Sequence, residues 1–213
     1  MSEGVFAHWP NRITALRFLG ALLLFVIFAL MGEAGPEATL SLPGGDLTMR
    51  TALKVCFWLF VLVAATDYLD GWLARAHGLV TAFGRIADPF VDKVLILGVL
   101  IYMAVLPWSR ELVPAWFVVV LLARELLVTG LRGYVESLGR EFPADRLGKL
   151  KMVAQCMAVG GVMFIPAHSW SESVHDGLEL LVRGLVLLTL VLTVVSGVGY
   201  VNKTRRILSE VEA

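Results

Sequence analysis

Long apolar stretches separated by short polar segments dominate the pattern of this chain. A helix crosses a bilayer with about 17–25 mostly apolar residues, and the polar ends of shorter stretches can continue as helix into the interface. Few polar faces exist to cover so many apolar helices in water, which argues against a soluble helical bundle. The pattern predicts an all-α integral membrane protein with six transmembrane helices. They are expected around residues 13–32, 51–66, 90–107, 112–131, 152–168 and 178–201.

The chain has 213 residues, which suits a single membrane domain over 1–213. The polar segments predict the connections between its helices. Residues 1–12 are expected to form a short interfacial segment, because Trp9 is typical of the membrane–water boundary. The six-helix bundle would cover 13–202, with an outer loop at the Gly- and Pro-rich residues 32–49. Residues 203–213 are expected to form a helical cytoplasmic tail.

Composition supports a membrane location: 58% of the residues are hydrophobic, although the net charge is zero. A neutral chain offers no overall field that would attract nucleic acid. If the N-terminus is inside and the helices alternate, most of the 18 Lys and Arg residues fall on the inner side. This bias predicts that both termini are cytoplasmic. The outer segments would carry only Arg50, Lys54, Arg110 and Arg183.

Four carboxylates occur close together in the stretch DYLDGWLARAHGLVTAFGRIADPFVDKV, which starts at residue 67. Helical residues advance by about 100°, so Asp67 and Asp70 share one face of the second helix. Asp88 and Asp92 likewise share one face of the third helix. Two helices joined by a short turn pack side by side, so the two acidic faces can meet. Four facing carboxylates cannot all remain ionised without cations.

Oxygen ligands of this kind favour hard divalent ions such as Mg²⁺, with Mn²⁺ or Ca²⁺ as alternatives. Four carboxylates suffice for two ions, which could bind a diphosphate and neutralise a leaving group at phosphorus. Gly71 would let a ligand approach the backbone closely, and Arg75 offers a planar donor fork for phosphate. The simpler interpretation, interfacial charges paired with Arg75, Arg85 and Lys93, would explain any single aspartate but hardly all four on matching faces.

The full spacing resembles the signature of the CDP-alcohol phosphotransferase family. It reads Asp67-x-x-Asp70-Gly71-x-x-Ala74-Arg75, then Gly84-x-x-x-Asp88-x-x-x-Asp92. Within that family, four stretches are similar to the bacterial phosphatidylglycerophosphate synthases: PNRITALR, DPFVDKV, ARELLVTGLR and GKLKMVAQ. The resemblance covers about residues 9–166, and Ala87 replaces a residue that is often larger in the family.

The resemblance implies a homodimer with six transmembrane helices in the cell (inner) membrane and an active site facing the cytoplasm. It implies transfer of the phosphatidyl group from CDP-diacylglycerol to glycerol 3-phosphate, with release of CMP. Two divalent ions, Mg²⁺ or Mn²⁺, would assist the reaction. By the same resemblance, Asp67, Asp70 and Asp88 are metal ligands, and Asp92 is the general base and a further metal ligand.

The donor nucleotide and the acceptor would use different residues. The resemblance assigns CDP contacts to Asp70, Gly71, Ala74, Arg75 and Gly84, and further candidates for the same nucleotide are Asn11, Thr14, Arg17 and Thr66. Glycerol 3-phosphate is a dianion, so its pocket needs cations. Candidates at the cytoplasmic ends of the fourth and fifth helices are Arg124, Arg132, Lys149 and Lys151. Each alone could be a topology signal, but Arg124 lies within an apolar run where an exposed charge is costly.

Several alternatives remain open. The same chemistry could serve another acceptor, either phosphatidylglycerol, as in cardiolipin synthase, or inositol phosphate. The candidate cations favour a phosphorylated acceptor over an uncharged one, but they do not separate glycerol phosphate from inositol phosphate. A membrane ion transporter would distribute its acids along a path, whereas these four cluster at one depth. An inactive scaffold would usually have lost part of the motif.

Overall fold

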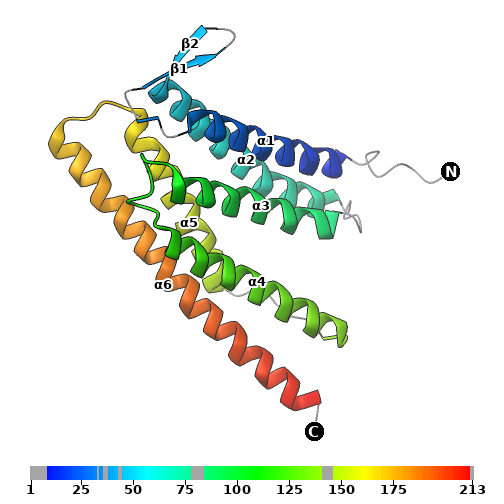
Figure 1. The fold of residues 1–213 in the computed structure, drawn as a ribbon. Coiled ribbons are helices and arrows are strands. Elements are labelled where there is room, and N and C mark those ends of the chain that lie inside the picture. Colours follow the sequence, from blue (N-terminus) through cyan, green and yellow to red (C-terminus); the bar gives the residue numbers. More distant parts are fainter. Residues whose placement is uncertain are drawn as a thin grey trace.

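The described part of the chain folds into six helices and one small β-hairpin (Figure 1). This computed structural model describes residues 9–32, 34–35, 38–42, 45–77, 84–140 and 146–211; it does not describe the side chains of residues 10, 40–42, 45–46, 67–77, 85 and 210–211. The helices are α1 Trp9–Met31, α2 Met49–His77, α3 Gly84–Val105, α4 Ala115–Ser137, α5 Arg146–Ala167 and α6 Glu172–Val211. The strands are β1 Thr39–Leu42 and β2 Gly45–Thr48, which pair antiparallel.

The helices form two groups joined by α5 (Figure 1). In the first group α1 packs against α2 and α3, and in the second α4 packs against α6. Helix α5 packs against α2 on one side and along α6 on the other. The α2–α3 end, the α4 C-terminus and both described chain ends lie toward the same end of the bundle, opposite the hairpin (Figure 1).

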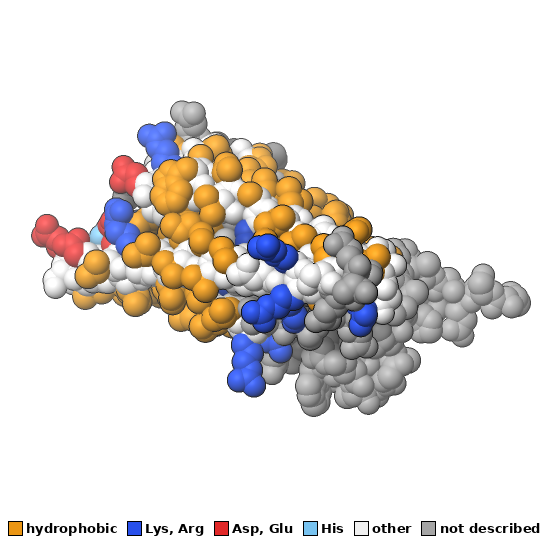
Figure 2. Space-filling model, turned by 90° about the horizontal axis from the view of Figure 1, so that it is seen from below, with side chains coloured by type: hydrophobic (Ala, Val, Ile, Leu, Met, Phe, Trp, Pro, Cys, Tyr) orange, Lys and Arg blue, Asp and Glu red, His pale blue; other side chains and the backbone are white. Residues whose placement is uncertain are grey.

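Apolar side chains fill the interior and also cover the exterior. Large side chains such as Phe28, Phe60 and Met163 are fully buried, whereas Leu19, Leu180 and many others on the helix surfaces are exposed. Figure 2 shows hydrophobic side chains over much of one face, with acidic side chains at one end of the view. Exposed apolar surface of this extent needs lipid around it.

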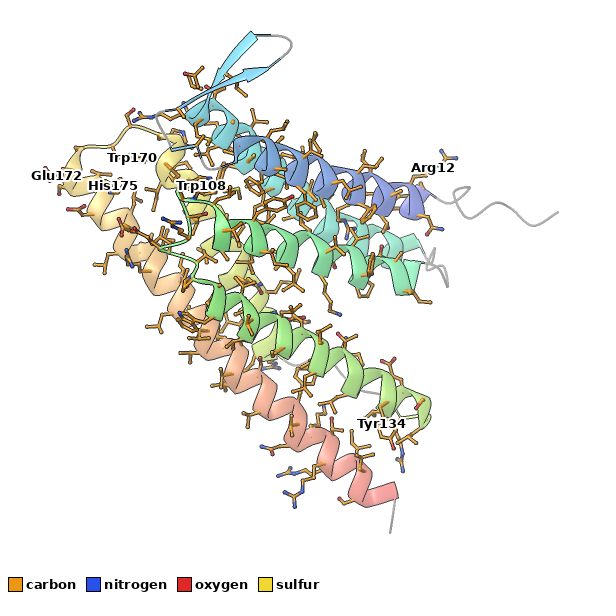
Figure 3. The ribbon with its side chains drawn as sticks, viewed as in Figure 1. Arg12, Trp108, Tyr134, Trp170, Glu172 and His175 are labelled. Carbon is orange, nitrogen blue, oxygen red and sulfur yellow. The ribbon has the colours of Figure 1, made fainter. Side chains whose placement is uncertain are left out.

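Four of the described helical segments are long and apolar enough to cross a membrane by length and composition: 11–31, 49–66, 146–167 and 172–209. The chain is therefore a multi-pass, helical membrane protein, which confirms the predicted fold class at that level. Six helices are present where six apolar stretches predicted them. Aromatic residues mark the two ends of the bundle in Figure 3, with Trp108 and Trp170 toward the hairpin and Tyr134 at the opposite end.

Several helices extend beyond the predicted apolar stretches, and the differences at α1, α6 and the outer loop change the predicted organisation. Helix α1 already starts at Trp9, so residues 9–12 of the expected interfacial segment belong to the first helix. Pro10 is compatible with this start because proline fits the first helical turn. Helix α6 continues to Val211, so the expected helical tail is one rod with the last helix. The expected outer loop contains the hairpin, whose four-residue strands are too short for sequence periodicity to resolve.

Two glycines bring pairs of helices into close contact. A Cβ added at Gly161 on α5 would meet Val182 Cγ2 on α6 at 2.5 Å, and one added at Gly98 on α3 would collide with the ring of Phe25 on α1. Small residues allow helix backbones in membranes to approach closely. The α1–α3 and α5–α6 pairs are therefore packed at short distance, which fixes the helices that carry the polar side chains described next.

Candidate active site

Two aspartates on α3 receive hydrogen bonds from α1. Thr14 Oγ1 donates to Asp88 Oδ1 at 2.5 Å, and Arg17 Nη1 donates to Asp92 Oδ1 at 2.7 Å. Both aspartates are half-buried, whereas only 1% of the Arg17 side chain is exposed. An ionised pair this far from water is maintained only with good geometry and an opposite charge. The α1–α3 contact therefore positions both carboxylates.

The buried polar face of α1 explains why these contacts form. Asn11, Thr14 and Arg17 recur every three residues, so they lie along one side of the helix, and all three are buried. They are the predicted nucleotide-binding residues of α1, and the structure brings Thr14 and Arg17 directly onto Asp88 and Asp92. Thr66 on α2 instead donates its hydroxyl to the Val63 carbonyl of its own helix at 2.7 Å. Gly84 is buried at the first position of α3.

The other half of the predicted acidic site lies on α2. The backbone of Asp67, Asp70, Gly71, Ala74 and Arg75 is helical, but their side chains lie outside the described part of the structure. Among the side chains that are described, no group of three or more His, Cys, Asp or Glu residues gathers around a common point. The four-carboxylate metal site therefore stays a prediction.

A second charged cluster joins α4, α5 and α6. The Glu125 carboxylate accepts hydrogen bonds from Lys151 Nζ and, at 3.0 Å, from Arg124 Nη1. Arg124 Nη2 donates to Ser196 Oγ at 3.0 Å, and the guanidinium lies over the Tyr200 ring, 5.4 Å from its centroid. The cluster is largely shielded from solvent, with 14% of the Glu125 side chain and 8% of the Lys151 side chain exposed. Glu125 thus holds two of the predicted acceptor-binding cations.

A cavity of about 210 Å³ connects the two clusters between α3, α4 and α5. It brings together three of the predicted site residues, Asp92, Arg132 and Lys151. Arg132 Nη2 also reaches the Tyr200 hydroxyl at 3.4 Å. Arg124 is joined to the cavity wall through Glu125, whereas Lys149 is exposed and does not line the cavity. The remaining lining residues are Pro89, Lys93, Ile96, Leu97, Glu125, Met152 and Gln155.

Glu125 and Gln155 are two polar cavity residues outside the predicted set. Glu125 follows Arg124 in an apolar run, and polar residues inside membrane helices are costly enough to suggest a role. Gln155 lies four residues after Lys151, which places both side chains on the same face of α5. These two signals are present in the sequence and could have extended the predicted set.

Apolar cavities flank α2 just before Asp67. One of about 500 Å³ lies between α2, α5 and α6 and is lined by side chains that include Phe57, Ala64 and Phe164. Another of about 270 Å³ lies between α1 and α2 and extends from Leu23 to Thr66. Both cavities therefore reach the last turn of α2 before Asp67, so that apolar cavities lie next to the predicted acidic face.

A model of the CDP-alcohol phosphatidyltransferase family matches residues 7–195, from the start of α1 into α6. The chain belongs to this family. This finding confirms the resemblance seen in the aspartate spacing. Members of the CDP-alcohol phosphatidyltransferase family generally depend on a divalent metal. The side chains that the structure describes on α3 fit such an ion. Asp88 and Asp92 lie one turn apart and offer carboxylate oxygens, the ligands that hard divalent ions prefer.

Curated relatives of this phosphatidyltransferase cover most of its length. The CDP-diacylglycerol–glycerol-3-phosphate 3-phosphatidyltransferase of Bacillus subtilis is 36% identical over 154 residues, which is 72% of this chain and 75% of the relative. The enzyme of the same name from Mycoplasma genitalium is 31% identical over 170 residues, 79% of this chain and 70% of the relative. A probable phosphatidylglycerophosphate synthase of Mycobacterium tuberculosis strain H37Rv is 37% identical over 161 residues, 74% of this chain and 69% of the relative.

Proposed function

We propose that this enzyme transfers the phosphatidyl group of CDP-diacylglycerol to glycerol 3-phosphate, forming phosphatidylglycerophosphate and CMP for phospholipid biosynthesis. The cavity lined by Asp92, Arg132 and Lys151 carries the proposal. A carboxylate able to take a proton and cations able to bind phosphate face one space, as an acceptor with both a hydroxyl and a phosphate requires. The names and extent of the curated relatives support the same reaction.

The donor diphosphate would bind at the acidic faces of α2 and α3. Asp67, Asp70, Asp88 and Asp92 would hold two divalent ions, Mg²⁺ or Mn²⁺, which neutralise charge on the diphosphate and on the departing CMP. The α1 residues Thr14 and Arg17 orient Asp88 and Asp92 through their hydrogen bonds. The residues that would contact CDP are Asn11, Thr14, Arg17, Thr66, Asp70, Gly71, Ala74, Arg75 and Gly84.

The reaction is a displacement at the β-phosphorus of the donor. Asp92 removes the proton of the acceptor hydroxyl as its oxygen attacks, so that a new oxygen–phosphorus bond forms. The bond between the β-phosphorus and the bridging oxygen breaks, and CMP leaves with the electron pair. Arg132 and Lys151 bind the acceptor phosphate within the cavity, Glu125 orients Lys151, and Arg124 and Lys149 add positive charge nearby.

The donor is a membrane lipid, and the space beside α2 suits its acyl chains. The two apolar cavities reach Ala64 and Thr66, within one turn of Asp67. A headgroup at the acidic face would therefore leave its acyl chains beside apolar walls, where burial of hydrocarbon is favourable.

Membrane placement follows the distribution of cations. We propose one domain with six transmembrane spans, both termini in the cytoplasm and the site facing the cytoplasm of the cell (inner) membrane. Arg12 and Lys203 lie near the two chain ends, which supports this orientation by the positive-inside rule. The homodimer is proposed from the family resemblance alone.

The proposal is tested by following CMP release from purified protein in detergent, with CDP-diacylglycerol and Mg²⁺. Glycerol 3-phosphate, inositol phosphate and phosphatidylglycerol are compared as acceptors. We expect release with glycerol 3-phosphate and a fall in kcat of about 10²–10⁴-fold in Asp92→Asn, the usual contribution of a general base.

Asp176→Asn is the matched control, because Asp176 is an exposed aspartate near the start of α6. It should retain the activity of the unaltered protein. Release with inositol phosphate or phosphatidylglycerol but not with glycerol 3-phosphate would contradict the acceptor. Absence of release with all three, from folded protein, would contradict the enzymatic function.

A further inference from the structure

The side chain of Gln155 stands out among the polar groups of the cavity. It is 2% exposed, and its Nε2 has no hydrogen-bond partner among the residues that the structure describes. The other described polar residues that line the cavity, Asp92, Lys93, Glu125, Arg132 and Lys151, are all charged. Gln155 is thus the one neutral donor among the described lining residues.

A buried amide without a partner is unfavourable. An unsatisfied donor loses its hydrogen bonds to water and gains none in return, so buried polar groups are nearly always paired with protein, water or ligand. Gln155 also lies in a helix that is otherwise largely apolar, where a hydrophobic residue would pack at no such cost. A ligand that enters the cavity and completes this hydrogen bond would explain the glutamine.

The position of Gln155 indicates which part of a ligand it meets. It follows Lys151 by one turn, about 6 Å along the axis of α5 and further from the cytoplasmic end of that helix. Ile96 and Leu97 line the same cavity. Because a phosphate dianion forms its strongest hydrogen bonds with cations, Arg132 and Lys151 are the better partners for the acceptor phosphate.

We propose that the side-chain amide of Gln155 binds the non-reacting hydroxyl of the acceptor. This inference rests on the proposed function. Glycerol 3-phosphate has a phosphate, a primary hydroxyl that attacks the donor and a secondary hydroxyl. The phosphate is matched by Arg132 and Lys151 and the attacking hydroxyl by Asp92, which leaves the secondary hydroxyl for the neutral amide. A hydroxyl both donates and accepts, so it can satisfy a glutamine amide without introducing charge.

This contact makes Gln155 a specificity-determining residue. A site built to bind a substrate hydroxyl discriminates against an analogue that lacks it, because the polar group of the site is then left unpaired. The matching analogue is 3-hydroxypropyl phosphate, which keeps the phosphate and a primary hydroxyl but has no secondary hydroxyl. The enzyme should prefer glycerol 3-phosphate over this analogue, and the preference should depend on Gln155.

The experiment measures kcat/KM for CMP release with each of the two acceptors, using the full chain in detergent with CDP-diacylglycerol and Mg²⁺. The unaltered protein should prefer glycerol 3-phosphate by about tenfold or more, which corresponds to one hydrogen bond. In Gln155→Leu the preference should fall to about twofold or less, through loss with glycerol 3-phosphate alone. Gln155→Met serves the same purpose if the leucine variant does not fold.

Thr189→Val is the control, because Thr189 is fully buried on α6 and donates its hydroxyl to the Leu185 carbonyl of its own helix. It should keep the full preference. An unaltered protein that uses both acceptors equally would overturn the inference, as would a Gln155 variant that slows both acceptors alike. No CMP release with either acceptor would instead count against the proposed function, so the two failures are distinguishable.

Discussion

Two buried charge clusters meet at the cavity, and their signs are opposite. On the α1–α3 side the groups proposed for catalysis are acids, Asp88 and Asp92, and α1 supplies donors to them. On the α4–α5–α6 side the groups proposed for binding are cations, chiefly Lys151 and Arg132, and the Glu125 carboxylate accepts hydrogen bonds from Lys151 and Arg124. Each cluster contains functional charges together with an opposite or neutral partner that orients them.

The difference shows what each partner does. Thr14 is a neutral partner that aims a carboxylate, so its loss should affect geometry more than stability. Glu125 is a charged partner shared by two cations away from water, and removing one member of a buried ion pair is strongly destabilising. Thr14 and Glu125 should therefore respond differently to substitution, Thr14 in rate and Glu125 in stability.

Glu125→Gln should produce the largest effect on stability, because an amide would replace the carboxylate shared by Arg124 and Lys151. We expect the free energy of unfolding to fall by about 3 kcal/mol, the lower end of the range for buried pairs, since part of the side chain is exposed. Thermal unfolding of the purified protein in detergent measures the change. Glu125→Gln combined with Lys151→Met should recover part of the loss.

Glu179→Gln is the control for that measurement. Glu179 accepts a hydrogen bond from Arg183 at 2.6 Å, but this pair is solvent-accessible, so its loss should cost less than about 1 kcal/mol. Equal destabilisation by the two glutamine variants would contradict the structural role of Glu125.

Arg132→Met should weaken the binding of the acceptor, glycerol 3-phosphate, without disturbing the hydrogen bonds of Glu125 to Arg124 and Lys151. A charge-assisted hydrogen bond contributes about 1.5–3 kcal/mol, so the KM for glycerol 3-phosphate should rise by about 10–150-fold. The KM for CDP-diacylglycerol should change by less than about twofold, because the two substrates bind to different clusters. Steady-state CMP release measures both constants. Arg183→Met, at an exposed site on α6, should change neither, and a rise in both KM values in Arg132→Met would argue against a separate acceptor site.

Thr14→Val should have the smallest effect and should act on the rate. It removes the 2.5 Å hydrogen bond to the Asp88 carboxylate, worth about 1.5 kcal/mol at the lower end for a charged acceptor, so kcat should fall by about tenfold. Thr14→Ser keeps the hydroxyl and should restore most of the rate. Thermal unfolding should differ little between the two variants. A valine variant with unchanged kcat would mean that Asp88 needs no help from α1.

Much of the fold could be predicted because apolar stretches report membrane helices directly. Hydropathy did not reveal where helices continue beyond the apolar part, and α4 runs to Ser137 and α6 to Val211. The pairs Thr14–Asp88 and Arg17–Asp92 could not be predicted, because they join residues 74 and 75 positions apart. Only the packing of α1 on α3 creates them.

The acceptor cations show how helical periodicity could have refined the prediction. Lys149 and Lys151 both lie near the start of α5, and both were expected in the pocket. Two residues advance a helix by about 200°, so the two side chains point in opposite directions. Lys151 is accordingly buried against Glu125, whereas Lys149 is exposed. The spacing of two residues therefore already indicates that only one of the two lysines can face the cavity.

Helix α6 has 40 residues and is about 60 Å long, roughly twice the thickness of a hydrocarbon core. Even when tilted, such a rod extends well past the lipid headgroups. Because Lys203, Arg205 and Arg206 belong to its last turns, the projecting part is cationic. We therefore expect the last turns of α6 to stand in water beyond the headgroups, as the charged end of a stiff rod.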